Sequence, residues 1–332
     1  MDNSDLLHQR LNNQKLSSSE FRNPADVVRW LGAVQAQDFE GAKWALGLRM
    51  RSASKDAIEK AYNEGKILRT HLMRPTWHFV TPDDIRWLLQ LTAPRVNTKA
   101  GPYYRKFELD AATFKRSNKA LTKALRGGKH LPRRALKAVL NEAGVAVDDP
   151  VRLAHVLLHA ELDGLICSGP IAGKQITYAL LEERVPATKP LDRDEALAQL
   201  ARRFFTSHGP ATLQDFVWWS GLTVADAKRA VALIDPPVGA NKSRQKSKHS
   251  AHFLPAFDEY LVAYTDREQG ILGPAVIVDG RIAGTWKRKF DNKTVTIFFS
   301  PLRSLNNSHL AAIATAADRY AAFVGLAVQF VY

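Results

Sequence analysis

Twice along the chain, helical spacing of apolar residues changes directly into two short strand-like runs. In the first case, helical spacing covers 55–63, with Ser54 as a candidate cap, and alternating runs follow at 67–72 and 76–80 on either side of Arg74-Pro75. Two short strands around such a break predict a hairpin. Helices followed at once by a hairpin are typical of a helix-turn-helix with a wing. The pattern therefore predicts an α+β fold built from tandem winged-helix units.

The same order recurs in the middle of the chain and changes toward its end. Helical patterns at 132–142 and 151–162 precede strand-like runs at 164–168 and 175–178, with a break at Gly169-Pro170. Further helices are expected at 194–207, 211–220 and 224–233, either as a third helix-turn-helix or as an ordinary helical hairpin. The last part is expected to be rich in strands, with runs at 275–278, 281–286 and 294–299, an Asp279-Gly280 turn, and a closing helix at 308–324.

A length of 332 residues is long for one hydrophobic core. We therefore expect several packed units. They are a first winged-helix unit with the Gln-Ala-Gln motif at 1–100, a second unit at 101–190, a third unit with a basic loop at 191–250, and a C-terminal hairpin region with its closing helix at 251–332.

The charge of the chain favours a polyanionic partner. Lys and Arg number 47 against 33 Asp and Glu, which gives a net charge of +14. Such an excess favours nucleic acid or an anionic membrane surface, although it also serves solubility alone. No run approaches the roughly 18 apolar residues of a membrane span. The acidic start of the chain is unlike a signal peptide, so a cytoplasmic, nucleoid-associated protein is expected.

Signatures of cofactor and metal enzymes are missing from the sequence. The single cysteine, Cys167, excludes an internal disulfide and a multi-thiolate zinc site, and its apolar surroundings predict a packing role. His155 and His159 share a helix face, but no Glu lies between them, which favours helix packing over zinc. There is no dinucleotide fingerprint and no nucleophile elbow. We expect neither a metal nor another cofactor.

The candidate catalytic motif is Gln35-Ala36-Gln37, which follows an apolar helical stripe that starts at Pro24 with Asn23 as a candidate cap. If the helix ends at Val34 or Gln35, the two glutamines lie in extended chain and share a face. Two amides can then hold one water and orient its lone pair. The alternative is that the glutamines are a polar helix end.

Three stretches of the chain resemble the AlkZ-like family of winged-helix DNA glycosylases. They are LGAVQAQDFEGAKWALGLR at 31–49, LRTHLMRPTWHFV at 68–80, and FLPAFDEY at 253–260, followed by Asp279-Gly280 and GTWKR at 284–288. The resemblance implies that Gln35 and Gln37 position a nucleophilic water. It also implies a concave DNA surface made by tandem winged helices, and a duplex-probing hairpin, for which 277–286 is the candidate. Where family members have Arg-Gly-Thr before the first-wing His, this chain has Arg74-Pro75-Thr76-Trp77-His78.

The implied reaction is hydrolysis of the N-glycosidic bond of purines alkylated at N7 or N3. Such a base is cationic and leaves readily, so orienting water at the sugar carbon supplies much of the rate. Asp38 could assist, but it is favoured as a helix cap because its side chain would face away from the two glutamines. No lysine is singled out as a Schiff-base nucleophile, which favours a monofunctional reaction. The competing function is a non-catalytic winged-helix DNA-binding protein or transcriptional regulator.

Basic and aromatic residues at several points are expected to contact double-stranded, damaged DNA, and no obligate protein partner is indicated. For Trp77, core packing is the alternative. The expected contacts are Arg74, Trp77, His78, Tyr104, Arg105, Lys106, Lys242, Arg244, Lys246, Lys248, Arg281, Lys287, Arg288 and Lys289.

Overall fold

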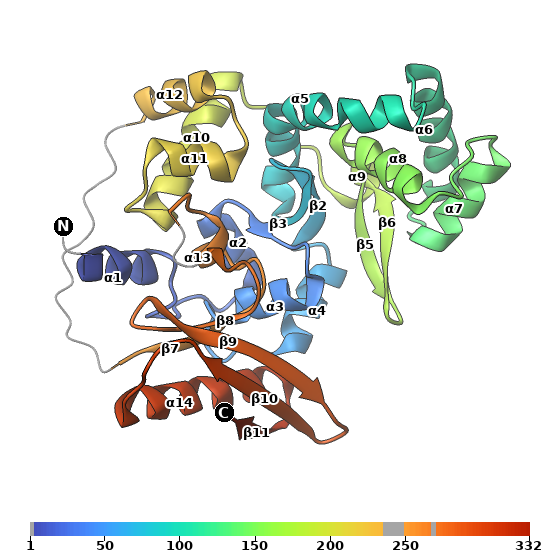
Figure 1. Cartoon of the computed structure of the whole chain (residues 1–332). Helices are drawn as coiled ribbons and strands as arrows, with labels where there is room; N and C mark the ends of the chain where they lie inside the picture. The colour runs from blue at the N-terminus through green and yellow to red at the C-terminus, as the bar shows by residue number, and fades with distance from the viewer. Residues whose placement is uncertain (1–2, 235–248, 267–269) are drawn as a thin grey trace.

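The computed structural model describes residues 3–234, 249–266 and 270–332. It is a mixed α+β protein in which two three-stranded sheets, each accompanied by helices, precede a helical segment and a five-stranded C-terminal sheet (Figure 1). The predicted α+β class is confirmed. In the described part of the chain, no helix is both long and apolar enough to cross a bilayer.

The N-terminal part contains a small sheet in the strand order β1-β3-β2. Strand β1 lies between two helices in the chain, and β2 and β3 form the hairpin that the sequence predicts. The Ser54 side chain caps its helix as expected, accepting from the Ala57 N–H. The elements are α1 (Asn3–Asn13), α2 (Pro24–Leu31), β1 (Val34–Gln35), α3 (Phe39–Gly47), α4 (Lys55–Asn63), β2 (Leu68–Leu72) and β3 (Thr76–Val80).

The middle part repeats this order, because a short strand, two helices and a hairpin again follow a helix. Its sheet has the matching strand order β4-β6-β5, with the expected break near Gly169-Pro170 present as a register shift between Ser168 and Ile171. The elements are α5 (Pro82–Lys106), α6 (Ala111–Leu125), β4 (Leu131–Pro132), α7 (Arg133–Glu142), α8 (Pro150–Leu162), β5 (Ile166–Ala172), β6 (Gln175–Leu180) and α9 (Leu181–Arg184).

Three helices follow, and no strand lies within the described residues 191–234. Thr212 and Asp215 form a capping box at the start of the second of these helices, and Gly221 ends it with φ +69°. The helices are α10 (Arg193–His208), α11 (Leu213–Ser220) and α12 (Val224–Ala232).

The C-terminal part is a sheet in the order β11-β10-β9-β8-β7, packed against α14. The expected turn at Asp279-Gly280 is present: Val278 pairs with Arg281, and both turn residues have positive φ, as a tight two-residue hairpin requires. The elements are β7 (Ala251–Leu254), α13 (Glu259–Val262), β8 (Ala275–Val278), β9 (Arg281–Phe290), β10 (Thr294–Pro301), α14 (Asn307–Val324) and β11 (Ala327–Val331).

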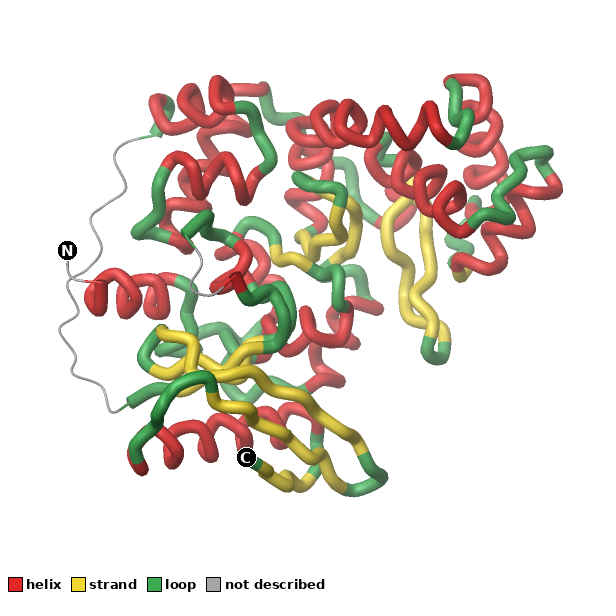
Figure 2. Tube along the Cα trace, in the orientation of Figure 1, coloured by secondary structure: helices red, strands yellow, loops and turns green. Residues whose placement is uncertain are grey.

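The hydrophobic cores join segments that are distant in sequence. One core combines residues 11–79 with residues 253–323, so the first and last predicted segments share their packing. A second combines the β2–β3 hairpin and α5 with α10–α12. A third lies within residues 109–180. Figure 2 shows the N-terminal helices and hairpin between the C-terminal sheet and the helices of the middle part. The proposed domain boundaries remain predictions.

One expectation about the first helix is wrong. The apolar stripe from Pro24 suggested a helix that ends at Val34 or Gln35, but α2 ends at Leu31. Gly32 adopts φ +86°, which turns the chain out of the helix, and Val34 and Gln35 then pair with β3. Asn23 takes the N-cap position without a side-chain hydrogen bond. The earlier end places the whole Gln-Ala-Gln motif outside the helix.

A buried ion pair holds the shared core of the first and last segments together. Both guanidinium Nη atoms of Arg49, in the turn after α3, lie 2.9 Å from the Asp258 carboxylate oxygens, and both side chains are fully buried. Gln14 accepts two further hydrogen bonds from the same guanidinium, one through its backbone carbonyl and one through its side chain. A buried charge pair with all its hydrogen bonds made fixes the positions of the segments that carry it.

We expect Arg49→Met to lower the free energy of unfolding by about 3–5 kcal/mol, because it leaves the buried Asp258 carboxylate without its partner. Urea unfolding measures this. Arg229→Met is the matched control, since Arg229 pairs with Asp194 on the surface, where loss of an ion pair costs about 1 kcal/mol or less. Equal losses in the two variants would contradict the proposed importance of the buried pair.

Candidate functional site

Gln35 lies in extended chain at the edge of the first small sheet. It pairs with His78 of β3, and the pairing ends one residue later, where the Ala36 N–H donates to the Trp77 carbonyl at 2.7 Å. The extended conformation that the two-glutamine hypothesis requires at Gln35 is therefore present.

The two glutamines differ in exposure. Gln35 is 8% exposed, and its Oε1 is buried and accepts no hydrogen bond from the described residues. Gln37 is exposed, in the bend that leads into α3. Asp38 caps α3 by accepting from the Gly41 N–H at 3.1 Å, which confirms the capping expectation. The segment thus carries one buried amide with an unused acceptor and one amide open to solvent.

A polar row crosses the sheet beside Gln35. His78 pairs with Gln35 on one side and with Thr70 on the other, and side chains directly opposite each other share a face. The Thr70 Oγ1 is also buried, with no hydrogen bond to any residue that the structure describes. Burial, with the charge of Arg74, lowers the pKa of His78 to about 4, so its imidazole is neutral at pH 7. The row therefore offers hydrogen-bonding groups without charge.

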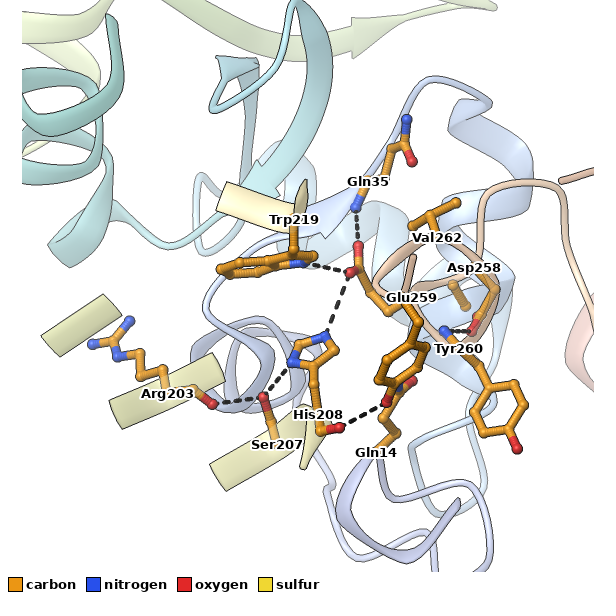
Figure 3. Close-up of polar contacts among 12 residues, drawn as sticks. Gln14, Gln35, Arg203, Ser207, His208, Trp219, Asp258, Glu259, Tyr260 and Val262 are labelled. Carbon is orange, nitrogen blue, oxygen red and sulfur yellow. Dashed lines mark hydrogen bonds and ion pairs between the residues drawn. The ribbon is translucent and has the colours of Figure 1, made fainter. Parts of the chain in front are cut away.

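A buried carboxylate supports the backbone of Gln35 (Figure 3). Glu259, the first residue of α13, is 1% exposed, and its Oε1 accepts from the Gln35 N–H at 2.7 Å. Its Oε2 accepts from Trp219 Nε1 at 2.8 Å and lies 3.5 Å from His208 Nε2. Burial alone would raise the pKa of Glu259, but the contact with His208 and the Gln35 N–H bring it well below its usual range. Glu259 is therefore ionised.

The opposite face of the sheet carries Trp77. The Arg69 guanidinium lies 4.2 Å from the centre of the Trp77 ring, and the His71 ring also lies 4.2 Å from it. Arg69 Nε donates to the Ala36 carbonyl at 2.9 Å, and His71 is paired with Glu161 of α8. Trp77 is half-buried in these contacts, so packing within the protein, the alternative to stacking on DNA, covers much of its ring.

The other residues expected to touch DNA fall into three groups. His78 is 1% exposed and cannot reach a partner outside the protein in this conformation. Arg74 and Tyr104 are half-buried: Arg74 lies over the Trp218 ring, and the Tyr104 hydroxyl donates to Asn97. Those at the surface are Arg105, Lys106, Lys287 and Lys289, and at least in part Arg281 and Arg288, whereas Lys242, Arg244, Lys246 and Lys248 lie outside the described residues.

The hairpin at 277–286 is not placed to probe a duplex. The Gly280 carbonyl accepts from the Tyr260 hydroxyl at 2.9 Å, and a side chain at Gly280 would meet Leu7 of α1. The turn is thus packed against the protein. The next hairpin, β9–β10, ends in three exposed residues at 291–293, which makes it the better candidate for a projecting element.

One group of side chains in the described ranges has the residue types of a metal site. His249, Asp279 and His309 place their ligand atoms within 4.8 Å of one another. Ligands around tetrahedral zinc lie roughly 3.4 Å apart, given zinc–nitrogen bonds of about 2.1 Å. His249 Nδ1 is already 2.6 Å from Asp279, whose second oxygen accepts from the Ser250 N–H. We interpret the group as a hydrogen-bonded cluster that secures the β8–β9 turn.

Sequence reasoning missed the residues that hold the Gln35 backbone. Glu259 lies in one of the stretches that resemble the AlkZ-like family, but it received no role, and Trp219 and His208 were not considered. A signal was present, because Asp258 and Glu259 interrupt an otherwise apolar and aromatic run from Phe253 to Val262. Two acidic residues in such a run predict buried, paired carboxylates.

Comparison with known proteins shows the family of the chain. The model of the AlkZ-like DNA glycosylase family matches residues 28–323, and the chain belongs to this family. The interstrand DNA cross-link repair glycosylase of Streptomyces sahachiroi is 24% identical to it over 87% of this chain and 88% of its own length. The solved structure of Streptomyces sahachiroi DNA glycosylase AlkZ has the same fold, with a TM-score of 0.78 at 21% identity over 99% of each chain.

The neutral state of buried His78 predicts a dependence of stability on pH. The unfolded chain binds a proton at this histidine near pH 6.5, whereas the folded protein binds it only near pH 4. The contribution of neutral His78 to the free energy of unfolding is therefore fully present above pH 6.5. It is lost as the pH falls from 6.5 to 4, which lowers the free energy of unfolding by about 3 kcal/mol. Urea unfolding between pH 7 and pH 4 should show a smaller loss for His78→Gln than for the wild type. Parallel curves would contradict the burial of a neutral His78.

Proposed function

We propose that this chain is a monofunctional DNA glycosylase that hydrolyses the N-glycosidic bond of cationic N7- or N3-alkylated purines in duplex DNA. The observation that carries the proposal is the Gln35 side chain, whose buried Oε1 has no hydrogen-bond donor among the described residues. A buried acceptor left without a partner costs about 1–3 kcal/mol. A water or a substrate group that donates to this oxygen removes that cost.

In the proposed mechanism, Gln35 and Gln37 hold the attacking water between them. Gln37 lies two residues beyond Gln35, in the bend before α3, so one amide would reach the water from the protein interior and the other from the solvent side. The amide oxygens accept the water's hydrogens and aim its lone pair at the sugar carbon. Because the alkylated base leaves as a neutral molecule, the reaction needs positioning more than a strong base. Asp38 already caps α3, so we assign it no catalytic step.

We further propose that the repeated units are winged helices that bind DNA. Support comes from the shared element order and from the matching strand orders β1-β3-β2 and β4-β6-β5. The helices α10–α12 would form a third helix-turn-helix. The net charge of +14 would act through phosphates, with the exposed bases as contacts. Of the residues expected from the sequence, we retain Arg105, Lys106, Arg281, Lys287 and Lys289, and we leave out buried His78.

Replacing either glutamine with alanine is expected to separate chemistry from binding. Gln35→Ala and Gln37→Ala should each lower single-turnover release of N7-methylguanine by about two orders of magnitude, because the held water acts mostly in the transition state. Affinity for the same duplex should stay within about threefold. The double variant should release base only slightly more slowly than the slower of the two single variants, since both groups act on one water.

Two further variants sharpen this test. Gln37→Asp should retain part of the rate, because a carboxylate can accept the water's hydrogen bond. Gln90→Ala removes an exposed glutamine of α5 and should leave the rate unchanged. If affinity falls in proportion to the rate in both motif variants, the pair is structural and the proposed mechanism is wrong.

The basic residues of β9 should differ in their contribution to DNA binding. Strand alternation places Lys287 and Lys289 on one face, whereas Arg288 lies 5.3 Å from the Trp286 ring and 5.6 Å from the Tyr320 ring on the other. Neutralising the two lysines should reduce the slope of log affinity against log salt by about 0.9 for each. Arg288→Gln should leave the slope unchanged. Binding titrations over a range of salt concentrations measure this, and an unchanged slope in the double-lysine variant would remove both from the DNA surface.

A further inference from the structure

The buried network behind Gln35 ties its backbone to two other segments of the chain. Glu259 is 1% exposed and receives the Gln35 N–H on one oxygen and the Trp219 indole N–H on the other. These three residues belong to α13, β1 and α11, which are far apart in sequence. In Figure 3 the Gln35 side chain extends away from Glu259, so the carboxylate contacts only its backbone. The amide group is thereby left for another partner.

The network continues from Glu259 into α10 through His208. The Ser207 hydroxyl donates to the Arg203 carbonyl at 2.7 Å and lies 2.8 Å from His208 Nδ1. His208 Nε2 then faces the Glu259 carboxylate at 3.5 Å. His208 therefore links α10 to the Glu259 carboxylate, which in turn accepts from the Gln35 N–H.

The carboxylate itself is held in place by its neighbour in the chain. Asp258 caps α13 by accepting from the Tyr260 N–H at 2.9 Å, and it binds the buried Arg49 guanidinium through both oxygens. Glu259 therefore projects from a helix start whose position is fixed on the other side. A hydrogen bond from such a point can set where the Gln35 backbone lies.

We propose that Glu259 is a positioning residue that fixes the Gln35 backbone, so that the Gln35 amide meets the attacking water in its productive place. This rests on the proposed function of Gln35. The physical reason is that the reaction depends on orientation, and a displacement of about 1 Å can cost about a hundredfold in rate. Glu259 touches neither water nor substrate in this role. It acts through the N–H of Gln35, with Trp219 and His208 fixing the second oxygen.

The test compares two substitutions of Glu259 by two independent measurements. Glu259→Met keeps the length of the side chain but cannot accept a hydrogen bond, whereas Glu259→Gln keeps one acceptor oxygen for the Gln35 N–H. Amide hydrogen exchange at Gln35 reports the hydrogen bond without any need for activity. Single-turnover release of N7-methylguanine, together with affinity for the same duplex, reports its consequence.

We expect Glu259→Met to speed exchange at Gln35 and to lower the rate of base release by about a hundredfold, with affinity nearly unchanged. Glu259→Gln should restore slow exchange and most of the rate. If Glu259→Met does not fold, Trp219→Phe replaces it, because that change removes one donor to Oε2 and leaves the Gln35 contact. Trp219→Phe should give a smaller change in the same direction in both measurements.

The matched control is Tyr264→Phe. The Tyr264 hydroxyl donates to the His208 carbonyl at 2.8 Å and accepts from Gln14, so it belongs to the same buried region, and neither of these hydrogen bonds involves Glu259. It should leave both exchange at Gln35 and the rate as in the wild type. The proposal is overturned if Glu259→Met, or Trp219→Phe in its place, keeps slow exchange at Gln35 and the full rate of base release. It is also overturned if Tyr264→Phe speeds exchange and lowers the rate as much as that variant does. Because exchange is read without catalysis, a wild type that releases no base would sink the proposed function and not the positioning.

Discussion

The arrangement of the site depends on the hydrogen bonds of two adjacent buried carboxylates, Asp258 and Glu259. Asp258 binds Arg49 through both oxygens, and Glu259 binds the backbone of Gln35 and the indole of Trp219. Removing such charges from water is costly unless their hydrogen bonds are made, so the position of each partner is strongly constrained. The two-residue strand β1 is therefore held both by its pairing with β3 and by the Glu259 carboxylate on another part of the chain. The C-terminal part of the chain thus positions a motif near the N-terminus.

This constraint fits the chemistry that we propose. A pair of neutral amides is a weak base, and it can support hydrolysis only where the leaving group is already activated and the water is well oriented. A cationic alkylated purine supplies the activation. The fixed backbone of Gln35, the neutral ring of His78 beside it, and the exposed amide of Gln37 would supply the orientation.

Local patterns in the sequence predicted the local structure well. The cap at Ser54, the β2–β3 hairpin and the Asp279-Gly280 turn depend on neighbouring residues only, and each is present. Helix α5 was not predicted, because it contains Pro94 and Pro102, which interrupt the helical pattern but are tolerated within a long packed helix. The early end of α2 could have been read from Gly32, but the apolar stripe continued past it.

The candidate site was only partly predictable. The Gln-Ala-Gln motif is contiguous and could be found, whereas Glu259 reaches it from more than two hundred residues away, which no local pattern shows. The exposure of single residues could not be predicted either. In the sequence His78 and Lys287 look equally suited to contact DNA, yet His78 is buried and Lys287 is on the surface. For β9, strand alternation could have separated Arg288 from its neighbours, because Trp286 marks the inward face.

The most direct test of the account is the fate of a duplex that carries a single N7-methylguanine, incubated with excess wild-type protein. We predict that free base is released well above the spontaneous rate, and that the strand keeps an intact abasic site, with no covalent adduct trapped by borohydride. Tight binding with no acceleration of release would instead make the chain a non-catalytic DNA-binding protein and would contradict the account.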